Sequence, residues 1–245
     1  MSLKKNTNDL REVISSLRSK VDGIYDAGQD AMWDCIQNYG NRTDYRSCFF
    51  ISGFSHIDPK WPVRASNSDS IFGNANKLET VNWEKFDLTA TSSLYNAFGF
   101  CYLLTEVDTD LAVVNGTATL LNSIFRNCYK LQRVKKLTAF PSAVWKNSFD
   151  ECRELTHIIF DGEIGANGLN LQWSTKLDKE SIESIINALS TTTSDLSVTL
   201  SETAVNQAFG YEEILDDSPN WVDGIYSPEW VALVDSKPNW TITLV

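Results

Sequence analysis

The sequence predicts an α/β solenoid whose central part is a short array of stacked repeats. Three segments share the pattern Phe-x-x-Cys-x-x-Leu-x-x-Val/Ile and recur in phase. Their repeated residues are Phe98, Cys101, Leu104 and Val107; Phe125, Cys128, Leu131 and Val134; and Phe149, Cys152, Leu155 and Ile158. A weaker copy begins at Phe72, so the four phenylalanines are 26, 27 and 24 residues apart. Apolar self-similarity with a period in the twenties is typical of a solenoid, in which each repeat buries its apolar side against the next.

The N-terminal region, residues 1–40, is predicted to contain one amphipathic helix over residues 8–36. Apolar and small residues at alternating spacings of four and three form a heptad seam: Leu10, Ile14, Leu17, Val21, Ile24, Gly28, Ala31 and Cys35. The helix either folds onto its own domain, or forms a short coiled coil that joins copies of the protein or attaches it to a larger assembly. A seam of this length does not decide between the two.

Residues 41–70 are predicted to be a connector, and residues 71–173 the solenoid. Pro59 and Pro62 exclude a helix in the connector, and its large apolar residues predict that it packs over the first repeat as a cap. In each repeat, the Phe-x-x-Cys part suits a turn of helix or irregular backbone on the outer side. The Leu-x-x-Val/Ile part suits a short strand on the inner side, so that stacked repeats form a narrow parallel sheet.

The last segment, residues 174–245, is predicted to be an α/β cap. Asp178 suits the N-cap of a helix over 179–190, which has one apolar face. Residues 197–200 and 241–245 alternate like half-buried strands, and a second helix is predicted over 228–236. Because terminal repeats must cover an exposed apolar face, we expect this segment to close the end of the solenoid.

The three repeat cysteines, Cys101, Cys128 and Cys152, are interpreted as a column of small buried side chains. Free cysteine behaves as a small apolar residue in protein cores. A metal site is the alternative, but it requires converging ligands at close spacing, and the sequence has no C-x-x-C pair or neighbouring histidine here.

Alignment of the repeats also brings surface positions into columns. One column contains Glu106, Arg133 and His157, and a second places Asp108 beside Lys135. These residues form either a solvated ladder of charges that supports the strand register, or a polar surface that faces a ligand.

A third set of candidate surface residues follows the repeat cysteine. Tyr102, Tyr129 and Arg153 occupy this position and are expected to line up on the outer side. Exposed tyrosine and arginine are common contact residues, although these three could equally pack on the next loop.

Composition and motifs argue against several classes of function. The net charge of −11 disfavours a nucleic-acid binder, since phosphate contacts require clustered Lys and Arg. No apolar run approaches the length of a membrane span, and the N-terminus does not resemble a secretion signal, so assembly in a cytoplasm is expected. There are two histidines and no recognisable nucleophile, phosphate-binding or zinc motif. We therefore expect no catalytic, cofactor-binding or metal-binding residues, and a protein that is not an enzyme.

The repeats resemble the BspA-like class of leucine-rich repeats, whose usual pattern is Ala-Phe-x-x-Cys-x-x-Leu-x-x-Ile. Ala97-Phe98-Gly99-Phe100-Cys101 matches this pattern most closely. The flanking regions look like repeat proteins encoded among the structural genes of phages and prophages of gut bacteria. The similar segments are the N-terminal helix, the turn at 40–45, residues 171–177 and 185–189, and the closing strand at 240–244.

This second resemblance implies a virion component at the tail, baseplate or capsid surface, with adhesive repeats and no catalytic residues. Its expected partners are other virion proteins and a glycan or protein of the host surface, with homo-oligomers formed through the N-terminal helix. Two alternatives stay open: a bacterial leucine-rich-repeat adhesin or interaction module, and a virion-associated carbohydrate-active enzyme.

Overall fold

The computed structural model describes Gly28 and residues 44–50, 52–113, 121–212 and 225–245. Apart from Gly28, the predicted helix over 8–36 lies outside these residues, and so does the coiled coil inferred from it. The elements described below belong to one compact unit, formed by residues 43–58 and 62–245.

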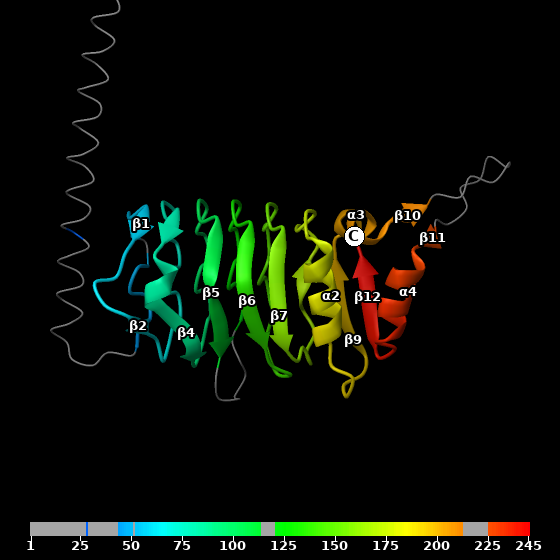
Figure 1. The fold of residues 1–245 in the computed structure, drawn as a ribbon. Coiled ribbons are helices and arrows are strands. Elements are labelled where there is room, and N and C mark those ends of the chain that lie inside the picture. The colour runs from blue at the N-terminus through cyan, green and yellow to red at the C-terminus, as the bar shows by residue number, and fades with distance from the viewer. Residues whose placement is uncertain (1–27, 29–43, 51, 114–120, 213–224) are drawn as a thin grey trace, which may run out of the picture. The chain divides into compact units, whose positions relative to one another are not determined.

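Parallel strands that follow one another along the chain lie side by side and build a solenoid (Figure 1). The main sheet has five strands in the order β2 (Val63–Arg64), β4 (Phe86–Thr91), β5 (Glu106–Val113), β6 (Arg133–Ala139) and β7 (His157–Gly162). A parallel pair, β1 (His56–Ile57) and β3 (Thr80–Val81), belongs to the first turns, and a short 3-10 helix, η1 (Trp83–Lys85), separates β3 from β4. The predicted solenoid of stacked parallel strands is confirmed.

A ladder of phenylalanine rings forms the centre of the solenoid. Phe72, Phe98, Phe125 and Phe149 are fully buried, and consecutive ring centroids are 5.5, 5.3 and 5.6 Å apart. Phe49 extends the ladder at 5.2 Å from Phe72. The ladder therefore has one ring more than the repeats that were aligned in the sequence. The alignment missed Phe49 because the cysteine and leucine that identify the later copies do not follow it.

The Phe-x-x-Cys segments are irregular turns rather than turns of helix. In each one the residues two positions before and two positions after the phenylalanine have positive φ. These pairs are Ser70 and Asn74, Asn96 and Phe100, Ser123 and Asn127, and Asn147 and Glu151. Asparagine and serine occupy most of these positions, and asparagine in particular tolerates the left-handed conformation.

Backbone hydrogen bonds join each turn to the next at matching positions. The N–H groups of Gln132, Thr156 and Asp178 donate to the carbonyls of Thr105, Gln132 and Thr156 at 2.8, 2.9 and 2.8 Å. The turns at Gln132 and Thr156 thus each receive the same bond that they give.

The repeat cysteines form the expected buried column, and their thiols are hydrogen-bonded. Cys101 Sγ donates to the carbonyl of Phe72 at 3.1 Å, Cys128 Sγ to that of Phe98 at 3.0 Å, and Cys152 Sγ to that of Phe125 at 3.1 Å. The hydroxyl of Ser174 continues the column by donating to the carbonyl of Cys152 at 3.2 Å. The small polar side chain at this position therefore satisfies a carbonyl of an adjacent turn.

We expect the three column cysteines to resist alkylation in the folded protein. Desolvation by burial raises the pKa of Cys101 to about 12 and also raises the pKa values of Cys128 and Cys152, so the reactive thiolate is scarce. Cys48 is only partly buried. A short iodoacetamide pulse followed by peptide mass spectrometry should label Cys48 in buffer, and the column cysteines only in denaturant. Labelling of Cys128 in buffer as fast as that of Cys48 would contradict the buried column.

The C-terminal part adds three helices and a second parallel sheet. The helices are α2 (Lys179–Ala188), α3 (Glu202–Phe209) and α4 (Pro228–Asp235). The sheet has the order β12 (Trp240–Leu244), β9 (Leu196–Leu200) and β8 (Asn170–Leu171), and β10 (Tyr211–Glu212) pairs with β11 (Ile225–Tyr226) in antiparallel fashion. Helix α3 is absent from the sequence predictions, because its eight residues carry too short an apolar pattern to identify a helix.

Helix α2 lies beside β7, where a further strand of the main sheet would otherwise pair (Figure 1). Ser181 Oγ accepts a hydrogen bond from the Ile158 N–H at 2.9 Å, and Ser184 Oγ accepts one from the Phe160 N–H at 3.2 Å. Two edge N–H groups of β7 are thus satisfied by serine hydroxyls. The helix begins as predicted after Asp178, whose carboxylate accepts the Ser181 N–H at 2.8 Å.

Candidate functional site

The first predicted column lies in register on the main sheet. Glu106 pairs with Arg133, and Arg133 pairs with His157, on strands β5, β6 and β7. The side chains of Glu106 and Arg133 are exposed, and that of His157 is half-buried. His157 Nδ1 lies 2.7 Å from Asp178 Oδ2, so the imidazole contacts the N-cap of α2. The structure therefore gives His157 a structural contact at the end of the column.

The second predicted column, Asp108 beside Lys135, falls at a break in the strand register. A bulge lies between Val107 and Asp110, because β5 advances from 106 to 110 where β6 advances from 133 to 136. The ammonium of Lys135 lies 3.4 Å from Asp110, on the far side of this bulge from Val107. Aligning the repeats without a gap could not reveal one extra residue inside a strand.

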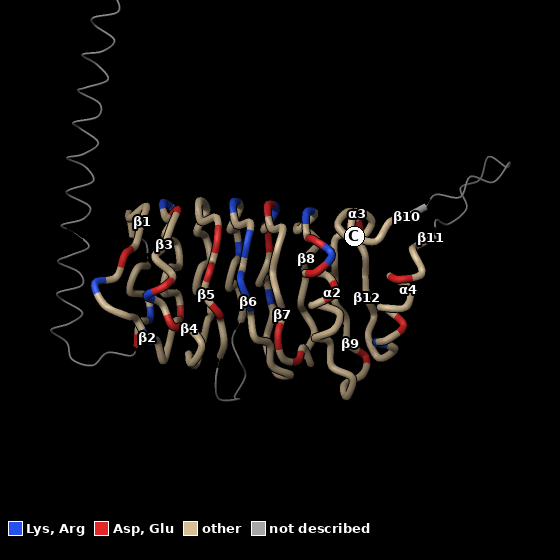
Figure 2. Tube along the Cα trace, in the orientation of Figure 1, with Lys and Arg blue, Asp and Glu red and all other residues tan. Residues whose placement is uncertain are grey.

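Asp110 is the centre of a small ion-pair network on this face. Lys136 Nζ lies 3.1 Å from Asp110 and 3.8 Å from Asp161. In the backbone trace, basic residues of β6 lie between acidic residues of β5 and β7 (Figure 2). Partial burial acts to raise the pKa of Asp110, but Lys136 and Lys135 outweigh it and the pKa is lowered. The hydrogen bond to Asp110 raises the pKa of Lys136. Exposed pairs of this kind contribute about 0–1 kcal/mol each, which fits a role in strand register.

The cysteine-flanking residues form a row of aromatic and basic side chains, in which Tyr129 and Arg153 are exposed and Tyr102 is half-buried. Tyr102 and Tyr129 stack with ring centroids 5.3 Å apart and an interplanar angle of 21°. Arg153 does not join this stack, because its guanidinium lies over the ring of Trp173 at 5.1 Å. Tyr129 and Arg153 both line one shallow depression. The three predicted residues therefore lie along the same row of turns, but in two separate stacking pairs.

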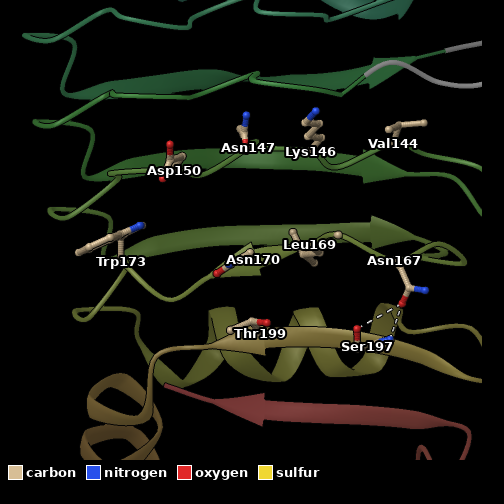
Figure 3. Close-up of a pocket in the computed structure, with 11 residues that line it drawn as sticks. Val144, Lys146, Asn147, Asp150, Asn167, Leu169, Asn170, Trp173, Ser197 and Thr199 are labelled. Atoms are coloured by element: carbon tan, nitrogen blue, oxygen red, sulfur yellow. Dashed lines mark hydrogen bonds between the residues drawn. The ribbon is translucent and has the colours of Figure 1, made fainter.

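Next to this row is a groove of about 330 Å³ that is lined by three segments of the chain (Figure 3). One wall is the turn that contains Asn147 and Asp150, the floor is formed by Leu169 and its neighbours around β8, and the opposite wall is β9. Trp173 lies at one end of the groove, and its side chain is 37% exposed. Asp150 lines both the groove and the shallow depression, so the two are adjacent.

The groove residues were not among the predicted site residues. A signal for Trp173 does exist, because Leu171, Ser174 and Leu177 continue the Phe-x-x-Cys-x-x-Leu spacing with substitutions at two of the three positions. In that register Trp173 immediately precedes the cysteine position, as Phe100 does three turns earlier. The contribution of β9 could not be predicted, since it depends on a strand pairing between residues about thirty positions apart.

Comparisons with known proteins do not identify the chain. No family model, curated protein or solved structure matches it. Among the residues that the structure describes, no three His, Cys, Asp or Glu side chains are grouped so that they could hold a metal ion. In the same described parts of the chain, no helix is both long and apolar enough to cross a membrane.

Proposed function

We propose that the protein is a non-enzymatic structural component of a phage particle, located at the tail, baseplate or capsid surface. Its BspA-like repeat domain presents a rigid surface to a glycan or protein of the host, or to other virion proteins. The N-terminal helix joins copies of the chain or attaches them to the particle.

The observation that carries the binding role is the exposed aromatic and basic row along successive turns. Tyr129 is 39% exposed although it stacks on Tyr102, and Trp173 is 37% exposed although Arg153 covers part of it. Tyrosine, tryptophan and arginine are the residues that most often contribute strongly to protein recognition. The two stacking pairs restrict the rotamers of these large side chains before any partner arrives, which reduces the entropy lost on binding.

The C-terminal segment acts in this proposal as the cap of the solenoid. The serine hydroxyls of α2 satisfy edge N–H groups of β7, which would otherwise be available to a strand from another molecule. This removes one sheet edge through which copies could join, and the proposal assigns assembly to the N-terminal helix.

Particle fractionation tests the virion assignment. Phage particles induced from the bacterium that encodes the protein are purified on a density gradient, and each fraction is analysed by mass spectrometry. We expect the chain to sediment with capsid and tail proteins at a constant ratio. Recovery of the chain in the envelope of cells that produce no particles would contradict the assignment and favour a bacterial adhesin, which the BspA-like repeats also support.

A further inference from the structure

We propose that the groove between the 144–150 turn, β8 and β9 binds a pyranose unit of a neutral oligosaccharide, with Trp173 as its stacking platform. The inference rests on the proposed recognition function and deepens it by naming the binding site and the class of ligand. The argument depends on three properties of the groove: its hydrogen-bonding groups, its net charge and the position of its one exposed indole ring.

The hydrogen-bonding groups of the groove are mostly amides and hydroxyls. Five neutral polar side chains line it: Asn147, Asn167, Asn170, Ser197 and Thr199. They come from three separate segments of the chain, and Figure 3 shows them distributed along both walls and the floor. A sugar presents several hydroxyls around one ring, each of which donates and accepts, and amides and hydroxyls offer both functions.

Two of the asparagines are held in one orientation by the backbone. Asn167 Oδ1 accepts hydrogen bonds from the Ser197 N–H at 2.6 Å and from Ser197 Oγ at 3.3 Å. Asn170 Oδ1 accepts the Gln172 N–H at 2.9 Å. Because a backbone N–H can only donate, the oxygen of each amide must face it, and this fixes where the amide N–H donors are. Donors that are already oriented lose little entropy when a ligand binds.

The charge of the groove favours an uncharged ligand. Its lining includes one cation, Lys146, and one anion, Asp150, whose formal charges cancel. Arg126, whose guanidinium lies 3.5 Å from Asp150, does not line the groove. A phosphate or nucleic acid would require an excess of basic groups. The same carboxylate can accept two hydroxyl donors of a neutral sugar.

An aromatic ring at one end supplies the apolar part of such a site. One face of a pyranose ring consists of C–H groups, which pack on an indole, while the hydroxyls at its rim stay available for hydrogen bonds. Trp173 is exposed at this end, and the cation–π contact with Arg153 restrains its ring. Gly168 also lines the groove, next to Leu169. Its φ is 101°, and the nearest atom to a Cβ placed there would be 4.0 Å away.

A peptide is a weaker candidate for this groove. Peptides that bind sheets usually pair with free backbone groups of an edge strand. Here β9 is paired on both sides, with β8 and with β12, and β8 has only two residues, so its remaining edge is too short to hold a peptide strand. The Thr199 N–H, for example, donates to the Leu169 carbonyl at 3.1 Å. What the groove offers a ligand is therefore side-chain chemistry.

Ligand-observed NMR of the full-length protein tests the proposal. Maltotriose, N,N′-diacetylchitobiose, lactose and a rhamnose disaccharide are the probes, each titrated while saturation transfer from the protein is recorded. At least one probe should show saturable binding with a dissociation constant of about 1 mM, which is typical of a small, exposed site that relies on few contacts. Absence of saturable binding for all four probes would overturn the proposal.

Matched variants then locate the binding. Trp173→Ala should weaken binding by roughly tenfold or more, the equivalent of about 1.4 kcal/mol, and Asn170→Ala should also weaken it. Tyr95→Ala is the control, because Tyr95 is another exposed aromatic residue, 44% exposed, and does not line the groove. Circular dichroism verifies that each variant is folded. Equal affinities of the Trp173→Ala and Tyr95→Ala variants would place the sugar elsewhere and reject the site. These measurements use purified protein and do not depend on the virion assignment. The protein can fail to bind sugar and still be found in phage particles, and it can bind sugar without being found in them.

Discussion

Replacing Phe125 by alanine is expected to lower the free energy of unfolding by about 3–5 kcal/mol, the usual cost of removing a buried phenylalanine ring. Phe125 is fully buried and lies between two other rings of the ladder, 5.3 Å from Phe98 and 5.6 Å from Phe149. Its removal leaves a cavity between the turn of Phe125 and each of the two neighbouring turns. Because contacts in a solenoid are made between nearest neighbours, the loss weakens both interfaces of the central turn.

Urea denaturation followed by circular dichroism measures this effect. Phe50→Ala serves as the control, since Phe50 is the same residue type but is 40% exposed. Its replacement should change the free energy of unfolding by no more than about 0.5 kcal/mol. Similar midpoints for the two variants would show that the ring ladder is not the core of the repeat domain.

Replacing Lys237 by methionine is expected to cost about 2 kcal/mol. The ammonium of this buried lysine donates to the carbonyls of Asn187 and Leu189 at 3.0 and 2.6 Å, at the C-terminal end of α2. Each buried carbonyl that loses its donor costs about 1–3 kcal/mol, and a cation at a helix C-terminus adds a favourable interaction with the helix dipole. Desolvation lowers the pKa of Lys237. Burial therefore destabilises the charged form of Lys237. The uncharged methionine side chain avoids this desolvation cost, which offsets part of the stability lost with the two hydrogen bonds.

The matched control for this variant is Lys77→Met, because Lys77 is an exposed lysine in a turn of the solenoid. Its effect should stay within about 0.5 kcal/mol. Hydrogen exchange provides a second measurement, since weaker contacts at the end of α2 should increase exchange in this helix more than in β5 and β6. Equal exchange in all three elements would argue that Lys237 does not hold the helix end.

The sequence was sufficient to predict the repeat core, because the phenylalanine, cysteine and leucine positions recur in phase and each repeat has the same neighbours. It also predicted the start of α2, since Asp178 precedes an apolar face with helical spacing. Three features escaped prediction. Phe49 lacks its partner residues, one extra residue forms the bulge in β5, and α3 is too short to show a clear period. In each case the deciding contact is tertiary and has no local pattern.

The candidate site was less predictable than the core. Tyr102, Tyr129 and Arg153 were predicted from their repeat position, and two of them do stack on each other. The groove depends instead on β8 and β9, whose pairing joins Asn170 to Thr199 and Leu171 to Leu200. Residues such as Asn147 and Ser197 are unremarkable in the sequence, because polar residues in turns and on strand surfaces are common. Only the folded chain brings them to the two sides of one groove.

The matched hydrogen bonds between turns have a consequence for how the molecule can change in length. Since Gln132 and Thr156 each receive the bond that they also give, a duplicated turn would meet the same partners on both of its sides. The stack can therefore grow or shrink in whole steps of about 4.8 Å, the spacing of adjacent strands, without requiring a new kind of interface. Equivalent side chains on neighbouring turns recur at this same interval. An extended polymer whose chemical groups repeat at a multiple of about 4.8 Å would make the same contact with several turns at once.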